Sequence, residues 1–123
     1  KKFEINIKPK DYYLNKKEIK YLDSLGMIVG SHSESHTLLS KLSYKKQLAE
    51  LKNSKIFLEK IINKNVDTFC YPYGRKISYN EDTIKILKKL KYKLAFSIDY
   101  RDISLKDIKK KPYELPRYDC SLF

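Results

Sequence analysis

Hydrophobic and polar positions along this chain follow two periods, and the changes between them predict the elements. Residues 3–8, "FEINIK", alternate apolar and polar and predict a strand. Three later apolar runs predict further strands, at residues 27–31, 66–72 and 93–98. The run at 27–31, "MIVGS", is typical of a strand buried on both faces of a parallel sheet. The segment "YELPRYDC" predicts a last, short extended stretch.

Three stretches between these runs have apolar residues at helical spacing. The first, "NKKEIKYLDSLG", starts at Asn15 as N-cap, with Glu18 placed for a capping box and Gly26 at the C′ position. A long amphipathic helix starts near Ser43, and a third helix starts after Asn80. The apolar stripes of the first two helices are Ile19, Leu22 and Leu25, and then Leu48, Leu51, Leu58 and Ile62. The lysine-rich stretch after residue 98 predicts a loop.

The alternation of strands and helices predicts an α/β fold with a largely parallel sheet. In such folds, functional residues lie on loops at the carboxyl ends of strands. His32 follows the run at 27–31, residues 71–74 follow the strand part of the second run at 66–70, and Asp99 follows the third. We therefore expect these three groups to meet at one edge of the sheet.

Length and composition limit the function classes. The 123 residues suit one small domain, and no apolar run is long enough to span a membrane. The net charge of +12 leaves two interpretations open: a lysine-rich composition, or an anionic partner such as nucleic acid. The lysines are spread over every segment and arginine is scarce, which favours the first interpretation. Cys70 and Cys120 leave both a disulfide and two free thiols possible.

His32 and His36 are the chain's two histidines, and their i, i+4 spacing allows both imidazoles to reach one cation. Such a pair is also common as incidental surface polarity, so both interpretations stay open. Two ligands are too few for a catalytic zinc, which usually has three protein ligands and an open position. Asp11, Asp99 and Asp102 are the candidates for the third.

The motifs together resemble the NodB homology domain of polysaccharide deacetylases, carbohydrate esterase family 4. "EIKYLDSLGMIVGSHSESH" is similar to the family's helix–strand unit followed by its S-H-T-x-x-H motif. "FCYPYG" resembles the family's proline–tyrosine loop, and "PYELPRYDC" resembles the closing segment of its smaller members. The resemblance covers about residues 14–120.

This resemblance implies part of a distorted (β/α) barrel and metal-dependent deacetylation of N-acetylated carbohydrate such as N-acetylglucosamine polymers. It implies that His32 and His36 bind a divalent ion, commonly zinc. The backbone N–H of Tyr73 would help to bind the oxyanion. Tyr71, Pro72 and Tyr73 would line the substrate groove, although both tyrosines have the plain alternative of core or edge aromatics.

The chain departs from the family pattern in three places. The T-F-D-D motif, which supplies a base and a metal ligand, has no counterpart among the 31 residues before His32. Cys70 stands where the family usually has an arginine that orients the base, and Arg117 is the candidate to replace it. No third histidine is present to act as the family's general acid. We therefore expect residues 1–123 to be the C-terminal portion of a NodB-like domain, with little activity by themselves.

The sequence thus predicts a hydrolase of carbon–nitrogen bonds other than peptide bonds, with a carbohydrate substrate and no specific nucleic acid. The intact protein is expected outside the cytoplasm or at the cell envelope. The alternative is a degenerate domain that binds carbohydrate through its tyrosines without hydrolysis. Asp99 and Arg117 also have plain alternatives, as a turn residue and as a surface residue.

Overall fold

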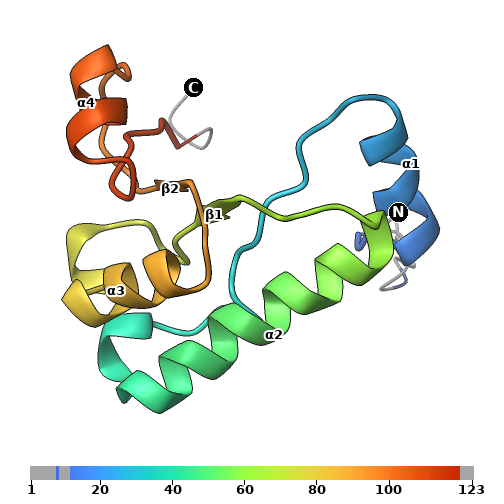
Figure 1. The fold of residues 1–123 in the computed structure, drawn as a ribbon, viewed down its shortest axis with the longest axis horizontal. Coiled ribbons are helices and arrows are strands. Elements are labelled where there is room, and N and C mark those ends of the chain that lie inside the picture. The colour runs from blue at the N-terminus through green and yellow to red at the C-terminus, as the bar shows by residue number, and fades with distance from the viewer. Residues whose placement is uncertain (1–7, 9–11, 120–123) are drawn as a thin grey trace, which may run out of the picture.

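The computed structural model describes residues 8 and 12–119. The elements in this part of the chain are α1 (Lys16–Ser24), η2 (Leu39–Lys41), α2 (Tyr44–Ile62), β1 (Thr68–Cys70), η3 (Lys76–Ser78), α3 (Glu81–Lys89), β2 (Leu94–Phe96) and α4 (Leu105–Lys110) (Figure 1). The strand predicted over residues 3–8 lies outside the described residues except for Lys8, which belongs to no element.

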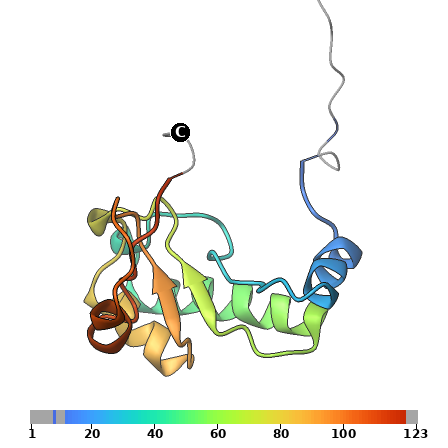
Figure 2. The ribbon, with the colours of Figure 1, turned by 90° about the horizontal axis from the view of Figure 1, so that it is seen from above.

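The sheet is parallel, as predicted. Strands β1 and β2 lie side by side (Figure 2), and Phe69 of β1 is paired with Ala95 of β2. A single residue extends the sheet on each side: Ser31 bridges to β1 at Phe69, and Leu115 bridges to β2 at Phe96, both in parallel orientation. All four segments therefore direct their carboxyl ends to the same edge, which is where the candidate site residues follow.

The helices begin where the caps predict. Asn15 accepts hydrogen bonds from the backbone of Lys17 and Glu18, and Glu18 bonds back to Asn15, which completes the predicted capping box. Asn80 caps α3 in the same way with Thr83. Gly26 follows α1 with a φ of 87°, a conformation that costs glycine little. The predicted starts of these helices are confirmed.

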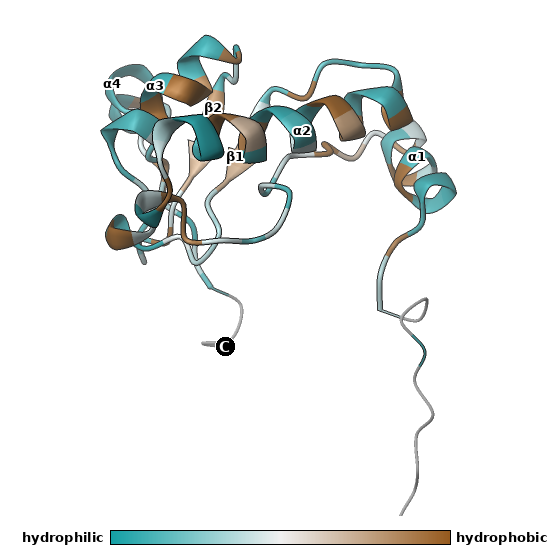
Figure 3. Cartoon of the chain, turned by 90° about the horizontal axis from the view of Figure 1, so that it is seen from below, coloured by the Kyte–Doolittle hydropathy of each residue, from teal (hydrophilic) through white to brown (hydrophobic). Residues whose placement is uncertain are grey.

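The core forms where α2 and α3 pack against each other and against the two strands. Figure 3 shows apolar colour on both strands and in patches along α2 and α3. The residues at the centre are less than 2% exposed: Leu39, Leu51, Val66, Phe69, Ile86, Leu87, Ala95 and Leu115. Of the stripe predicted for α2, Leu51 and Ile62 are buried, and Leu48 and Leu58 pack partly against the core.

The prediction of a doubly buried strand over residues 27–31 is wrong. Only Ser31 forms a bridge, through N–H donation to the Thr68 carbonyl at 2.9 Å and acceptance from the Cys70 N–H at 2.8 Å. Met27 is 55% exposed and Ile28 is 84% exposed. An apolar run indicates burial only if other segments cover it, and no described segment covers these two side chains.

The prediction of a loop over the lysine-rich stretch is also wrong, because residues 105–110 form α4. Ser104 accepts a hydrogen bond from the backbone N–H of Asp107, and the Asp107 carboxylate accepts one from the backbone of Ser104 at 2.9 Å. This is a capping box of the Ser-x-x-Asp type. The sequence-based prediction followed the high lysine content of this stretch and did not use the Ser104–Asp107 capping box.

Candidate functional site

Four chain segments supply the walls of one cavity at the carboxyl edge of the sheet. His32 follows the Ser31 bridge, Tyr73 follows β1, Ile98 follows β2, and Arg117 follows the Leu115 bridge. The cavity has a volume of about 600 Å³ and is lined by His32, His36, Leu38, Tyr73, Arg75, Ile77, Ser78, Ile98, Arg117 and Asp119. The parallel topology thus brings together residues that are as far apart in sequence as His32 and Asp119.

The two imidazoles lie next to each other in this cavity. Their ring centroids are 4.9 Å apart and their planes meet at 64°. Nδ1 of His32 lies 2.7 Å from the carbonyl oxygen of Cys70, and because a carbonyl can only accept, Nδ1 carries the proton. The lone pair of neutral His32 is therefore on Nε2, the arrangement that a histidine ligand of a metal usually has.

Tyr73 lies beside the histidines. Its ring centroid is 4.9 Å from that of His36, with an angle of 61° between the planes. Its φ of 60° places it in the left-handed region, and Gly74 follows with a φ of 66°. Within the described residues, the backbone N–H of Tyr73 has no hydrogen-bond acceptor. This loop therefore holds a free backbone donor near the imidazoles.

The rest of the proline–tyrosine loop differs from the expectation. The Tyr71 side chain is 0% exposed, its hydroxyl donates to the Tyr113 carbonyl at 2.8 Å, and its ring stacks on Tyr79 at 3.8 Å. Burial raises the pKa of Tyr71, with a smaller effect of Tyr79 in the same direction. Pro72 is less than 2% exposed. Tyr73, at 54% exposed, is the member of the three that offers a surface to a ligand.

Arg117 lies against Cys70, the residue that stands where an arginine was expected. Burial raises the pKa of the Cys70 thiol, and the guanidinium of Arg117 opposes this shift through its charge and a hydrogen bond. Nε of Arg117 is buried without a partner among the described residues. Arg117 thus reaches the end of β1 from a different segment.

The environment of His32 favours the neutral imidazole. Removal from water lowers the pKa of His32, the hydrogen bond to Cys70 opposes this shift, and electrostatic interactions with His36 and Arg117 lower the pKa further. A metal binds only the neutral form of imidazole, so this shift keeps His32 in the form that a metal would need down to a lower pH.

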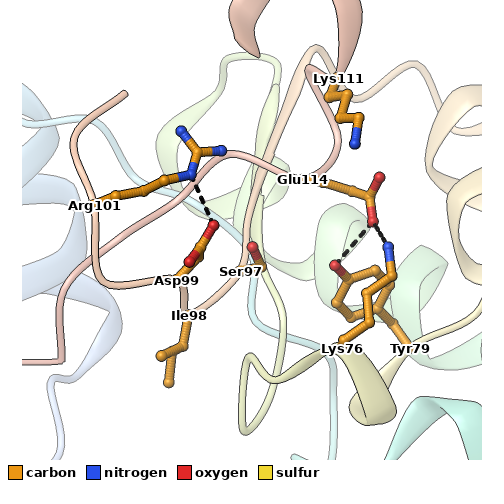
Figure 4. A pocket seen from close by; sticks show the side chains of 8 residues that line it. All are labelled: Lys76, Tyr79, Ser97, Ile98, Asp99, Arg101, Lys111 and Glu114. Atoms are coloured by element: carbon orange, nitrogen blue, oxygen red, sulfur yellow. Dashed lines mark hydrogen bonds and ion pairs between the residues drawn. The ribbon is translucent and has the colours of Figure 1, made fainter. Parts of the chain in front are cut away.

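Asp99 does not join the histidines. It lines a second cavity of about 280 Å³ on the other side of Ile98, shown in Figure 4. There Arg101 donates to the Asp99 carboxylate at 2.9 Å, and Glu114 accepts from Lys76 and from the Tyr79 hydroxyl.

Asp102, another candidate for the third metal ligand, does not line the cavity of the histidines either. Asp102 accepts from the Tyr118 hydroxyl at 3.2 Å, and Asp11 lies outside the described residues. In the part of the chain that the structure describes, no three His, Cys, Asp or Glu side chains could share a metal ion.

Two charged residues of the first cavity were not predicted from the sequence. Arg75 directly follows the proline–tyrosine loop, and Asp119 lies two residues after Arg117. The signal for Asp119 was available, because residues i and i+2 of an extended segment lie on the same face. The cavity therefore holds a carboxylate besides the basic groups.

Comparison with known proteins identifies the family. The family model of polysaccharide deacetylase matches residues 3–95. This chain belongs to the polysaccharide deacetylase family. It is 26% identical over 88 residues to the putative polysaccharide deacetylase YxkH of Bacillus subtilis (strain 168), a match that covers 72% of this chain and 30% of that protein.

Solved structures agree with this assignment to the deacetylase family. The Streptococcus pyogenes deacetylase PplD in complex with acetate is 31% identical, with a TM-score of 0.77 over 85% of this chain and 44% of that chain. The polysaccharide deacetylase BC0361 from Bacillus cereus is 27% identical, with a TM-score of 0.75 over 92% of this chain and 34% of that chain. The chain thus spans less than half the length of each of these relatives.

The predicted fold class, part of a NodB-type α/β fold, is confirmed by these structures and by the family model. The boundary prediction, a single C-terminal portion over residues 1–123, stays a prediction. Among the described helices, none has the length and apolar character needed to cross a membrane.

Proposed function

We propose that this chain contributes to metal-dependent deacetylation of N-acetylated carbohydrate, such as polymers that contain N-acetylglucosamine. The observation that carries the proposal is the grouping of His32, His36 and the Tyr73 backbone N–H around one cavity in a deacetylase fold. Hydrolysis of an acetamide needs an activated water, a donor for the developing oxyanion and a positioned acid or base. The cavity offers groups suited to part of this task.

His32 and His36 are the proposed ligands of a divalent metal, most suitably zinc. Their chemistry fits, because neutral imidazole is a good zinc donor and the Cys70 carbonyl leaves Nε2 of His32 available. When bound, the ion would polarise the acetyl carbonyl and acidify water. The remaining protein ligand is expected from outside the described residues.

The backbone N–H of Tyr73 is the proposed oxyanion donor. It has no acceptor among the described residues, and its loop conformation is fixed by the Arg75 N–H, which donates to the Tyr73 carbonyl at 2.9 Å. A donor that is already oriented stabilises a tetrahedral anion without reorganisation during the reaction. The exposed ring of Tyr73 would pack on a sugar face.

Arg117 is proposed to orient the catalytic base, which we expect outside the described residues. Its guanidinium lies at the end of β1 against Cys70, and its buried Nε lacks a partner within the described part of the chain. An unpaired buried donor is costly, so a carboxylate at this place would be stabilised.

We further propose that the intact protein acts outside the cytoplasm or at the cell envelope.

The test is acetate release from N-acetylglucosamine oligomers by the natural polypeptide in which residues 1–123 occur. We expect release with zinc, loss of release after chelation, and loss in the His36→Ala variant. Asp99→Asn, in the second cavity, is the matched control and should retain the rate of the unaltered protein. Release that is equal with and without chelator would overturn the proposal. Oligomer binding that ignores chelator, without release, would establish a carbohydrate-binding domain instead.

A further inference from the structure

The backbone of the segment between the two histidines is held by one side chain of α2. The Glu50 carboxylate accepts hydrogen bonds from the backbone N–H groups of Glu34 at 3.1 Å and Ser35 at 2.9 Å. It also accepts from the Ser35 hydroxyl at 2.6 Å. Hydrogen bonds to an ionised acceptor are stronger than those between neutral groups. Three of them converge here on a segment that has no regular secondary structure.

This segment needs such support because its backbone is strained at both ends. Ser33 has a φ of 66° and His36 a φ of 54°, values that non-glycine residues rarely adopt. Inside the turn, the His36 N–H donates to the Ser33 hydroxyl at 3.1 Å. Strained conformations persist only where surrounding contacts determine them, and the contacts from Glu50 lie between the two strained residues.

The position of Glu50 is itself well determined. The next residue, Leu51, is 0% exposed in the core, so the register of α2 is fixed at this point. Asn53, one turn further along α2, donates to the Glu34 carboxylate at 2.8 Å. The segment between the histidines is thus attached to a rigid helix rather than to another loop.

We propose that Glu50 is a positioning residue that sets the distance and orientation between the imidazoles of His32 and His36. The inference rests on the proposed function, since positioning matters most if the two rings share a metal. Glu50 acts through the backbone of residues 34 and 35 and does not line the cavity of the histidines. Loss of outer contacts of this kind typically weakens metal binding by about 10- to 100-fold.

The experiment compares zinc affinity, measured by competition with a chromogenic chelator, in three variants of this chain. Glu50→Ala removes all three acceptor contacts and should weaken zinc binding by about tenfold or more. Glu50→Gln keeps a carbonyl oxygen for the two N–H groups and should rescue most of that affinity. This rescue separates positioning from simple attraction between a carboxylate and the cation.

Glu59→Ala is the matched control. Glu59 also lies on α2 and accepts a backbone N–H, that of Val66 at 3.0 Å, but it has no contact with the histidine segment. Glu59→Ala should therefore bind zinc as the unaltered chain does. Equal losses in Glu50→Ala and Glu59→Ala, or none in Glu50→Ala, would overturn the inference.

Amide hydrogen exchange of residues 34 and 35 in the metal-free chain separates this inference from the proposed function. Glu50→Ala should speed exchange at both amides by tenfold or more, whereas Glu50→Gln and Glu59→Ala should leave them protected. If the unaltered chain binds no zinc, the proposed function fails, and the exchange pattern still decides the role of Glu50. Exchange at unaltered rates in Glu50→Ala would contradict it.

Discussion

Two cavities lie on either side of Ile98, at the same edge of the sheet. They differ in whether their polar groups already have hydrogen-bond partners within the protein. In the cavity shown in Figure 4, the carboxylates of Asp99 and Glu114 already accept hydrogen bonds from Arg101, Lys76 and Tyr79. In the cavity of the histidines, the Tyr73 N–H and Nε of Arg117 have no acceptor among the described residues.

This difference shows that a high density of charge does not by itself make a site. Paired groups at the surface contribute modestly to stability and have little binding capacity left. Oriented donors and lone pairs without internal partners keep theirs for a ligand. We therefore propose that the cavity of the histidines is the reactive site and that the ion pairs of the second cavity have a structural role.

The largest expected effect is on the free energy of unfolding, and it comes from the contact between Gly74 and Ile98, the residue that lines both cavities. A Cβ on Gly74 would lie 2.6 Å from Cγ1 of Ile98 and 3.0 Å from its backbone nitrogen, and the φ of Gly74 is 66°. Overpacking of this kind costs about 1–3 kcal/mol, and the left-handed backbone adds about 1–2 kcal/mol for a non-glycine residue. Gly74→Ala should lower the free energy of unfolding, measured in urea, by the sum of both.

Gly26→Ala is the control for Gly74→Ala. Gly26 has a φ of 87°, but a Cβ there would meet nothing within 4 Å. Only the conformational cost of about 1–2 kcal/mol should appear. Equal losses in the two variants would show that Ile98 does not form a tight wall against Gly74.

A smaller effect, on the pKa values of His32 and Cys70, is expected when the positive charge of Arg117 is removed. The charge of Arg117 lowers the pKa of both His32 and Cys70. Arg117→Gln should therefore raise both pKa values and slow the alkylation of Cys70 severalfold at neutral pH. Cys120 is changed to serine in both proteins so that one thiol is followed. Unchanged alkylation would place Arg117 away from the thiol in solution.

The pH dependence of stability should differ between the cavities. Because removal from water lowers the pKa of His32 in the fold, the unfolded chain binds its proton more readily. The contribution of His32 to stability is complete above the ordinary imidazole pKa of about 6.5 and is lost as the pH falls through and below it. The urea midpoint should fall between pH 8 and pH 5, and less so in His32→Gln.

The ion pairs beyond Ile98 should not respond over that range. Hydrogen bonds from Arg101 hold the pKa of Asp107 well below its usual range, so its contribution is lost only in stronger acid. A midpoint that falls equally in the unaltered chain and in His32→Gln would assign the pH dependence to other groups.

The smallest effect is expected from Asp99→Asn. The carboxylate of Asp99 pairs with Arg101, which also binds Asp107 through two hydrogen bonds, so one of several contacts is weakened. We expect an unchanged urea midpoint and a zinc affinity within about twofold of the unaltered chain, in keeping with the low contribution of exposed ion pairs. A large loss of zinc affinity would connect the two cavities.

The features that the sequence predicted well are set locally. Asn15 and Asn80 cap their helices through bonds to residues two or three positions away. The meeting of His32 and Tyr73 followed from parallel topology, since carboxyl ends of parallel strands share an edge, whereas Asp99, the third group expected there, lines the other cavity.

The features that failed depend on contacts made elsewhere in the fold. Exposure of Ile28 depends on which segments cover it, and burial of Tyr71 depends on Tyr79 and Tyr113. Asp99 has the strand-end position of a site residue, but a neighbouring arginine occupies its carboxylate. The role proposed for Glu50 depends on a contact between α2 and a loop, which periodicity does not predict.

Zinc titration tests most directly whether His32 and His36 bind a metal. The titration compares this chain with His32→Ala and His36→Ala, and Asp99→Asn is the control. We expect one zinc ion per unaltered chain and per Asp99→Asn chain. We expect zinc binding to be weakened at least about tenfold in each histidine variant. Equal, negligible zinc in the unaltered chain and in both histidine variants would contradict the assignment of His32 and His36 as ligands.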